Sequence, residues 1–167
     1  RMSREAEYWQ NQIGNDPATL HLPLDHPRLP ITNHSGANFS VDLPAILTAP
    51  FVALLGAAGV TPFTGYQSVF KILLQRYSGQ QSILVGSPIA QRHRSENSSL
   101  IGFFQNMLVL RSDFSDNPSF SDFLTAEQQT LGYAFAHQEF PFAKLVDLLN
   151  PHRESGINPI FQTAFVY

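Results

Sequence analysis

The chain contains no cysteine, little charge and no long apolar run, and each of these absences removes a class of protein. Without cysteine it can form neither a disulfide nor a thiolate metal site. No apolar stretch approaches the roughly 20 residues that span a bilayer, so we expect no membrane segment. A net charge of −3 argues against nucleic acid as a partner, because nucleic acids are bound by broad basic surfaces. The polar start of the chain does not resemble a signal peptide, and a cytoplasmic location is the expectation.

Signatures of several enzyme classes are also missing. The sequence has no glycine-rich phosphate loop with a lysine, no histidines paired at metal-binding spacing and no Gly-x-Ser-x-Gly elbow around Ser87. We therefore expect no metal site and no cofactor bound directly by the chain.

The composition that remains is apolar and aromatic. Of the 167 residues 43% are hydrophobic and 14 are phenylalanine, which is typical of a globular domain. The excess of phenylalanine leads us to expect that some aromatic side chains face a partner. Because the chain starts with Arg1 and stops inside an apolar run at 165–167, we interpret it as a segment of a longer polypeptide, with no second domain within residues 1–167.

Periodicity and turn residues predict a mixed α/β, α+β-like order of elements. We expect helices from Ser3 to Gly14 and over 44–58, 62–78, 119–136 and 141–149, and strands over 38–43, 82–89 and 103–112.

Two of the predicted strands differ in their patterns. In 38–43 polar and apolar residues alternate, so Phe39, Val41 and Leu43 are expected to face a core. The run over 82–89 is apolar without alternation, as in a strand that is covered on both faces.

The helix predictions rest on caps, spacing and proline. Pro50 falls inside the helix over 44–58, so either it kinks that helix or the helix begins later, with Thr48 as its cap. The Thr61-Pro62 pair starts the next helix and Gly79 ends it. In the long helix the apolar residues expected toward the core are Phe120, Phe123, Leu124, Leu131 and Phe135.

Three phrases in the second half of the chain carry a resemblance to a known family: IGFFQNMLVLR at 101–111, HQEFPFAKLV at 137–146 and RESGINPIFQ at 153–162. They resemble signature motifs of the condensation domain of nonribosomal peptide synthetases. Shorter pieces agree in the family's order, among them YW at 8–9, LDHPR at 24–28, RYSGQ at 76–80 and VGSP at 85–88. The sequence departs from the family's pattern at Gln105, Met107, Ala143 and Ile157.

The resemblance implies the chloramphenicol acetyltransferase-like fold of CoA-dependent acyltransferases, in which two similar lobes form a tunnel. Carrier proteins insert phosphopantetheine arms from opposite sides, and an amide bond forms at a histidine of the HHxxxDG motif in the first lobe. No two histidines are adjacent in this chain. We therefore expect most of the C-terminal lobe, which supplies a tunnel wall, contains no catalytic residue and is inactive alone. The missing N-terminal lobe and the carrier proteins are the expected partners.

Asn106 is the first candidate for that wall. On the strand over 103–112 it shares a face with Phe104, Leu108 and Leu110, so its amide is a polar group among apolar neighbours. The structural alternative is that the amide hydrogen-bonds to the backbone of a neighbouring strand. The resemblance places this asparagine close to the active site.

Further wall candidates are Phe104, Ser87, His137 and Gln138. His137 ends the long helix, and its structural alternative is an interaction with the unpaired carbonyls there. No carboxylate and nucleophile flank it in the sequence, so we do not predict that it is catalytic.

Arg92 and Arg94 form the densest cationic spot and are candidates to contact the phosphate of a pantetheine arm. A solvated loop is the structural alternative.

Three functions stay open at this point. The first is an amide-forming condensation domain, the second a domain of the same fold that epimerises, cyclises or forms esters, and the third a non-catalytic platform that binds carrier proteins.

Overall fold

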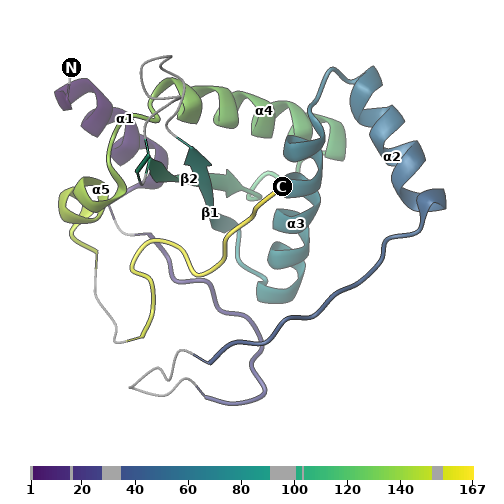
Figure 1. Cartoon of the computed structure of the whole chain (residues 1–167), viewed down its shortest axis with the longest axis horizontal. Helices are drawn as coiled ribbons and strands as arrows, with labels where there is room; N and C mark the ends of the chain where they lie inside the picture. Colours follow the sequence, from purple (N-terminus) through teal and green to yellow (C-terminus); the bar gives the residue numbers. More distant parts are fainter. Residues whose placement is uncertain (1, 16, 28–34, 91–100, 103, 152–155) are drawn as a thin grey trace.

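An antiparallel hairpin lies at the centre of the fold, built from β1 (Ser82–Ala90) and β2 (Gln105–Asp113). The computed structural model describes residues 2–15, 17–27, 35–90, 101–102, 104–151 and 156–167. Around the hairpin lie the helices α1 (Met2–Ile13), α2 (Ala45–Ala57), α3 (Pro62–Ser78), α4 (Phe120–Ala136) and α5 (Phe142–Leu149) (Figure 1). The predicted mixed order of helices and strands is confirmed, except for the strand over 38–43.

Helices cover both faces of the hairpin. Directly paired residues of an antiparallel ladder share a face, and on one face Ser112 of β2 contacts Glu127 of α4. On the other face the guanidinium of Arg111 donates to the carbonyl of Ile13 at the end of α1. The apolar run over 82–89 was therefore correctly predicted as a strand covered on both sides.

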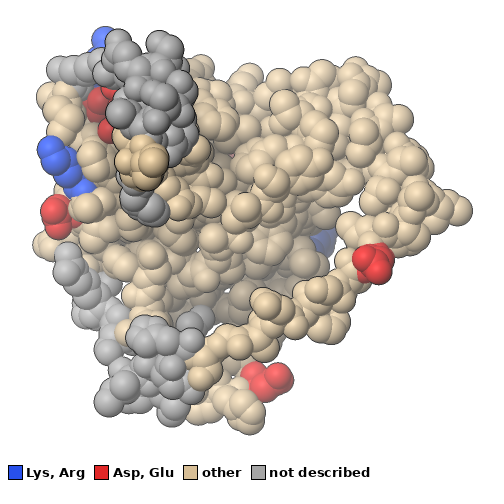
Figure 2. Space-filling view, in the orientation of Figure 1, with Lys and Arg blue, Asp and Glu red and all other residues tan. Residues whose placement is uncertain are grey.

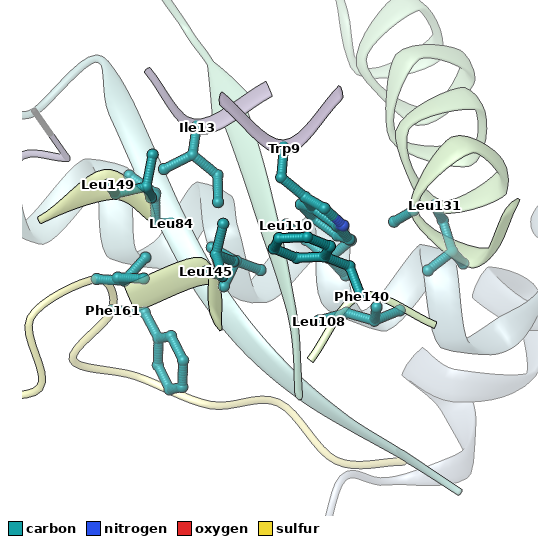
Figure 3. Packing of buried hydrophobic residues seen from close by; sticks show 13 residues of the cluster. Trp9, Ile13, Leu84, Leu108, Leu110, Leu131, Phe140, Leu145, Leu149 and Phe161 are labelled. Carbon is teal, nitrogen blue, oxygen red and sulfur yellow. The ribbon is translucent and has the colours of Figure 1, made fainter. Parts of the chain in front are cut away.

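The largest core cluster joins α1, the hairpin, α4, the turn after α4 and α5. Figure 3 shows the indole of Trp9 beside Phe140 and Leu110, with Leu131 reaching in from α4. Burying side chains of this size contributes about 1.5–3 kcal/mol each. The cluster thus fixes α1 and α5, which are far apart in the sequence, against the same sheet.

The predicted caps of α3 are confirmed, and the predicted start of α4 is confirmed with Ser119 as its cap. The side chain of Thr61 accepts from the backbone N–H of Thr64 at 3.2 Å, and Gly79 ends α3 in the left-handed conformation with φ 68°. Ser119 accepts from the N–H of Asp122 at 3.2 Å and starts α4.

The predicted strand over 38–43 is wrong. Residues 35–44 run as an extended segment, and the side chains of Phe39, Val41 and Leu43 are 91%, 66% and 61% exposed. Alternating polar and apolar residues suit a strand with one buried face, but a strand also needs a neighbouring backbone that bonds its N–H and C=O groups. Neither of the described strands pairs with this segment.

The helix predicted over 44–58 is present, but its alternative start is wrong. α2 begins at Ala45 after Pro44, not at Thr48, and Pro50 lies inside the helix. α2 packs mainly through Leu55, while Ile46 is 80% exposed. Figure 2 shows that the surface over α2 and the extended segment before it carries almost no charged side chains.

The predicted core face of α4 is correct in its middle only. Phe123, Leu124 and Leu131 are buried, whereas Phe120 and Phe135 near the two ends are 37% and 42% exposed.

The end of the chain runs beside β1. The N–H of Gly86 donates to the carbonyl of Thr163, and the N–H of Phe165 donates to the carbonyl of Gly86. These bonds form a single parallel bridge between Gly86 and Ala164.

None of the described helices is by itself long and apolar enough to cross a membrane, and α2 and α3 meet that length and composition only as a pair bent by 114°.

Candidate functional site

The side chain of Asn106 binds the stretch between α4 and α5 and caps the start of α5. Its Nδ2 donates to the carbonyls of Gln138 and Phe140, each at 2.9 Å, and its Oδ1 accepts from the N–H of Phe142 at 3.1 Å. Phe142 is the first residue of α5, and the preceding Pro141 makes no side-chain cap. Asn106 therefore replaces the missing cap from a different element.

Asn106 thus uses both amide protons and its oxygen on residues 138–142. The structural alternative predicted backbone partners for the amide, and the three groups that it bonds are indeed backbone groups. The alternative placed them in a neighbouring strand, whereas they belong to the stretch between α4 and α5. We refer to residues 137–141 as the α4–α5 turn.

His137 opens this turn, and its side chain is held by α1. Its Nδ1 lies 2.7 Å from a carboxylate oxygen of Glu5, and its ring stacks on that of Tyr8 with centroids 3.9 Å apart. Its backbone carbonyl accepts from the indole N–H of Trp9 at 3.2 Å. The expected interaction of this side chain with helix-end carbonyls is wrong, because a carboxylate from another helix binds the ring instead.

Tyr8 is held in an apolar setting. Burial, with a smaller contribution from nearby Tyr133, raises the pKa of the Tyr8 phenol to about 12. Its hydroxyl oxygen is buried and has no hydrogen-bond partner among the described residues. The ring therefore acts in the stack on His137 and not as an acid or base at neutral pH.

Ser87 lies on the same face of the hairpin as Asn106. In the ladder Asn106 pairs with Ile89 and Ser87 pairs with Leu108, so Ser87 and Asn106 are diagonal neighbours. Ser87 is 3% exposed, and its hydroxyl donates to the carbonyl of Phe165 at 3.1 Å. Its oxygen is engaged in positioning the end of the chain against β1.

The other predicted residues are placed as follows. Phe104 lies just before β2 and is half-buried, and Gln138 is half-buried in the α4–α5 turn with its carbonyl on Asn106. Asn106, Ser87, Phe104, His137 and Gln138 therefore gather at one end of the hairpin. Arg92 and Arg94 lie outside the described residues. Within the described ranges no three His, Asp or Glu side chains are grouped to hold a metal ion.

A buried ion pair is the feature that the sequence did not predict. Nζ of Lys71 in α3 lies 2.6 Å from Oε2 of Glu127 in α4, and the hydroxyl of Ser112 donates to the other oxygen. Burial lowers the pKa of Lys71, and the charge and hydrogen bond of Glu127 oppose that shift. The signal was the helical spacing of Thr64, Gln67, Ser68 and Lys71, a polar stripe that α3 buries.

A comparison with known protein families identifies the family of this chain. The family model described as "Condensation domain" matches residues 1–167. The chain belongs to the condensation-domain family. The resemblance inferred from the three phrases is confirmed.

Curated relatives place this condensation sequence among nonribosomal peptide synthetases. It is 42% identical over 165 residues to one of the linear gramicidin synthase proteins of Brevibacillus parabrevis, covering 99% of this chain and 2% of the relative. It is 39% identical to the phosphinothricin tripeptide synthetase PhsC of Streptomyces viridochromogenes, covering 99% of this chain and 15% of that protein. The chain therefore spans only a small part of these relatives.

Solved structures confirm the fold class. The four-domain nonribosomal peptide synthetase holo-AB3403, bound to AMP and glycine, matches with a TM-score of 0.92 at 24% identity, over 96% of this chain and 12% of that chain. The X-domain from teicoplanin biosynthesis matches with a TM-score of 0.91 at 22% identity, over 98% of this chain and 36% of that chain. The mixed helix and sheet structure is thus that of the chloramphenicol acetyltransferase-like condensation fold.

Proposed function

We propose that residues 1–167 form most of the C-terminal lobe of a condensation domain that joins aminoacyl or peptidyl groups by an amide bond. The observation that carries the proposal is that a condensation-domain sequence extends over the whole chain while no two histidines are adjacent in it. The lobe supplies a wall of the reaction tunnel, and the catalytic base belongs to the N-terminal lobe, which is its partner.

A tunnel wall can contribute to this reaction without supplying a catalytic base, by orienting the two reactants. The acceptor amine must meet the thioester carbonyl at the right distance and angle, and orientation of two reactants supplies about 7–11 kcal/mol in well-ordered systems. Side chains that hydrogen bonds hold in one position, such as those of Asn106 and Ser87, suit such a role because they do not reorganise during the reaction.

In this proposal the wall is formed around Asn106, Phe104, Ser87, His137 and Gln138. Asn106 and Ser87 act through the backbone segments that they hold, because their polar atoms are already hydrogen-bonded. The phosphopantetheine arms of carrier proteins are the substrate carriers, and Arg92 and Arg94 are the candidates to contact their phosphate.

A non-catalytic binding platform is the second candidate. One solved structure of this fold is a complex of the X-domain and OxyB from teicoplanin biosynthesis, in which the matching domain binds a protein. At 22% identity that likeness concerns the fold alone, so amide formation stays the leading proposal.

The test is a transplantation. Residues 1–167 replace the matching 165-residue segment in a condensation domain of the linear gramicidin synthase relative, and two loaded carrier proteins are the substrates. We expect amide product from this hybrid and none from residues 1–167 alone. Product from the isolated chain would contradict the role of a wall without a base. A folded hybrid that binds both carriers but forms no amide would favour the platform.

A further inference from the structure

Three residues of α1 converge on His137, the first residue of the phrase HQEFPFAKLV. Glu5, Tyr8 and Trp9 are spaced i, i+3 and i+4, so they lie on one face of the helix. Each contacts a different part of His137: the carboxylate its Nδ1, the phenol ring its face, and the indole N–H its carbonyl oxygen. We call these three residues the α1 clamp.

The buried carboxylate makes this contact specific. Glu5 is 8% exposed, and a buried carboxylate is costly unless it is hydrogen-bonded. Because a carboxylate oxygen only accepts, the proton of the bond lies on Nδ1 of His137, which fixes the orientation of the ring. The partners are 132 residues apart in the sequence, so the bond ties the start of the chain to the α4–α5 turn.

The same turn is held from the other side by β2. Trp9 binds the carbonyl of His137, and Asn106 binds the carbonyls of Gln138 and Phe140 together with the N–H of Phe142. Four backbone groups within six residues are therefore bonded to side chains of two other elements. The conformation of the turn therefore depends on contacts from α1 and β2 in addition to its own backbone hydrogen bonds.

We propose that Glu5 is a positioning residue which, through His137 and together with Trp9, sets the conformation of the α4–α5 turn for the reaction. This inference rests on the proposed function, because it assumes that the turn lines the reaction site. Glu5 touches no reacting atom, and its effect passes through His137.

The first test measures the turn in residues 1–167 without any activity. Trp9 is the only tryptophan, so its emission reports the clamp directly. In Glu5→Ala we expect emission at longer wavelength and faster hydrogen exchange at the Phe142 amide. Glu5→Gln keeps a hydrogen-bond acceptor for Nδ1 and is expected to restore both signals. Glu7→Ala is the matched control, since it removes the same charge from an exposed position of the same helix.

A Glu5→Ala protein that matches Glu7→Ala in both signals would overturn the clamp. If Glu5→Ala does not fold, Glu5→Asp is measured instead, because it keeps the charge but is one methylene shorter. The same shift and faster exchange are then expected, and their absence overturns the clamp.

The second test measures the reaction in the hybrid condensation domain. We expect Glu5→Ala to lower kcat by roughly tenfold or more, as a displaced positioning group does, with Glu5→Gln and Glu7→Ala within about twofold of the unmodified hybrid. Unchanged kcat in Glu5→Ala, with the spectroscopic change present, would overturn the positioning role and leave the proposed function intact. An inactive unmodified hybrid would instead count against the proposed function, while the first test still decides the clamp.

Discussion

At the scale of single residues, the polar groups inside this fold decide which elements meet. Lys71 and Glu127 form a buried ion pair between α3, α4 and β2, where their side chains are 0% and 3% exposed. Removing one partner of such a pair leaves a buried charge without compensation, whereas removing both avoids the cost of desolvating them.

We predict that Lys71→Met lowers the free energy of unfolding by about 3–5 kcal/mol. The double variant Lys71→Met, Glu127→Gln is expected to recover most of this loss, because glutamine still accepts from Ser112 and carries no charge. Chemical denaturation of the two proteins checks the prediction. A double variant as unstable as the single one would show that packing of the lysine stem, and not charge compensation, dominates at this position.

The sequence indicated some of these residues and could not indicate others. Asn106 stood out because an amide on an apolar strand face needs partners, although the partner element was predicted wrongly. The role of Glu5 was not predictable, because its partner His137 lies 132 residues away and only tertiary packing joins them. The stripe that contains Lys71 was visible as a helical repeat, but polar stripes are normally solvated.

At the scale of elements, local signals predicted the helices well and the sheet less well. As predicted, α3 starts after Thr61 and ends at Gly79, and α4 starts after Ser119. These limits can be predicted because a helix cap bonds to residues within one turn of the chain. Residues 38–43 have the alternation of a strand but no paired strand among the described residues, and pairing cannot be read from the segment itself.

Two helix glycines offer a matched comparison of packing and propensity. A Cβ added to Gly65 in α3 would lie against the side chain of Leu55 in α2, too close for an unshifted contact, whereas one added to Gly132 in α4 meets nothing within 4 Å. We predict that Gly132→Ala stabilises the protein by about 1 kcal/mol through helix propensity. We predict that Gly65→Ala destabilises it by about 1–3 kcal/mol, because α2 must move away.

Thermal unfolding of the two glycine variants, followed by circular dichroism, gives the comparison. If both alanines stabilise the protein equally, the close approach of α2 to α3 is not a constraint on the fold.

At the scale of the whole molecule, the apolar side chains are unevenly distributed. The hairpin is covered on both faces, yet the extended segment over 35–44 and α2 leave Phe39, Val41, Leu43, Ile46, Leu47, Val52 and Leu54 exposed. A helix without a charged residue, such as α2, is normally buried, and exposed apolar patches mark contacts with other surfaces. Phe39, at 91% exposed, is the aromatic residue of this surface that is available for such a contact.

We predict that residues 1–167 bind a hydrophobic dye and self-associate through this surface. The double variant Phe39→Ser, Ile46→Lys is expected to reduce dye fluorescence and association without lowering the midpoint of thermal unfolding, because both side chains are largely exposed. Sedimentation velocity and dye titration measure the two effects. A monomer that binds no dye before mutation would show that the surface is not apolar enough to need a partner.

The central claim, that these residues form a wall of an amide-forming site, is tested most directly by the rate of amide formation in the hybrid condensation domain. The predicted result is amide product at a rate within about tenfold of the unmodified relative, abolished when the relative's own HHxxxDG histidines are replaced by alanine. A hybrid that folds and binds both loaded carriers but forms no amide above the level of the histidine-deficient control would contradict the claim.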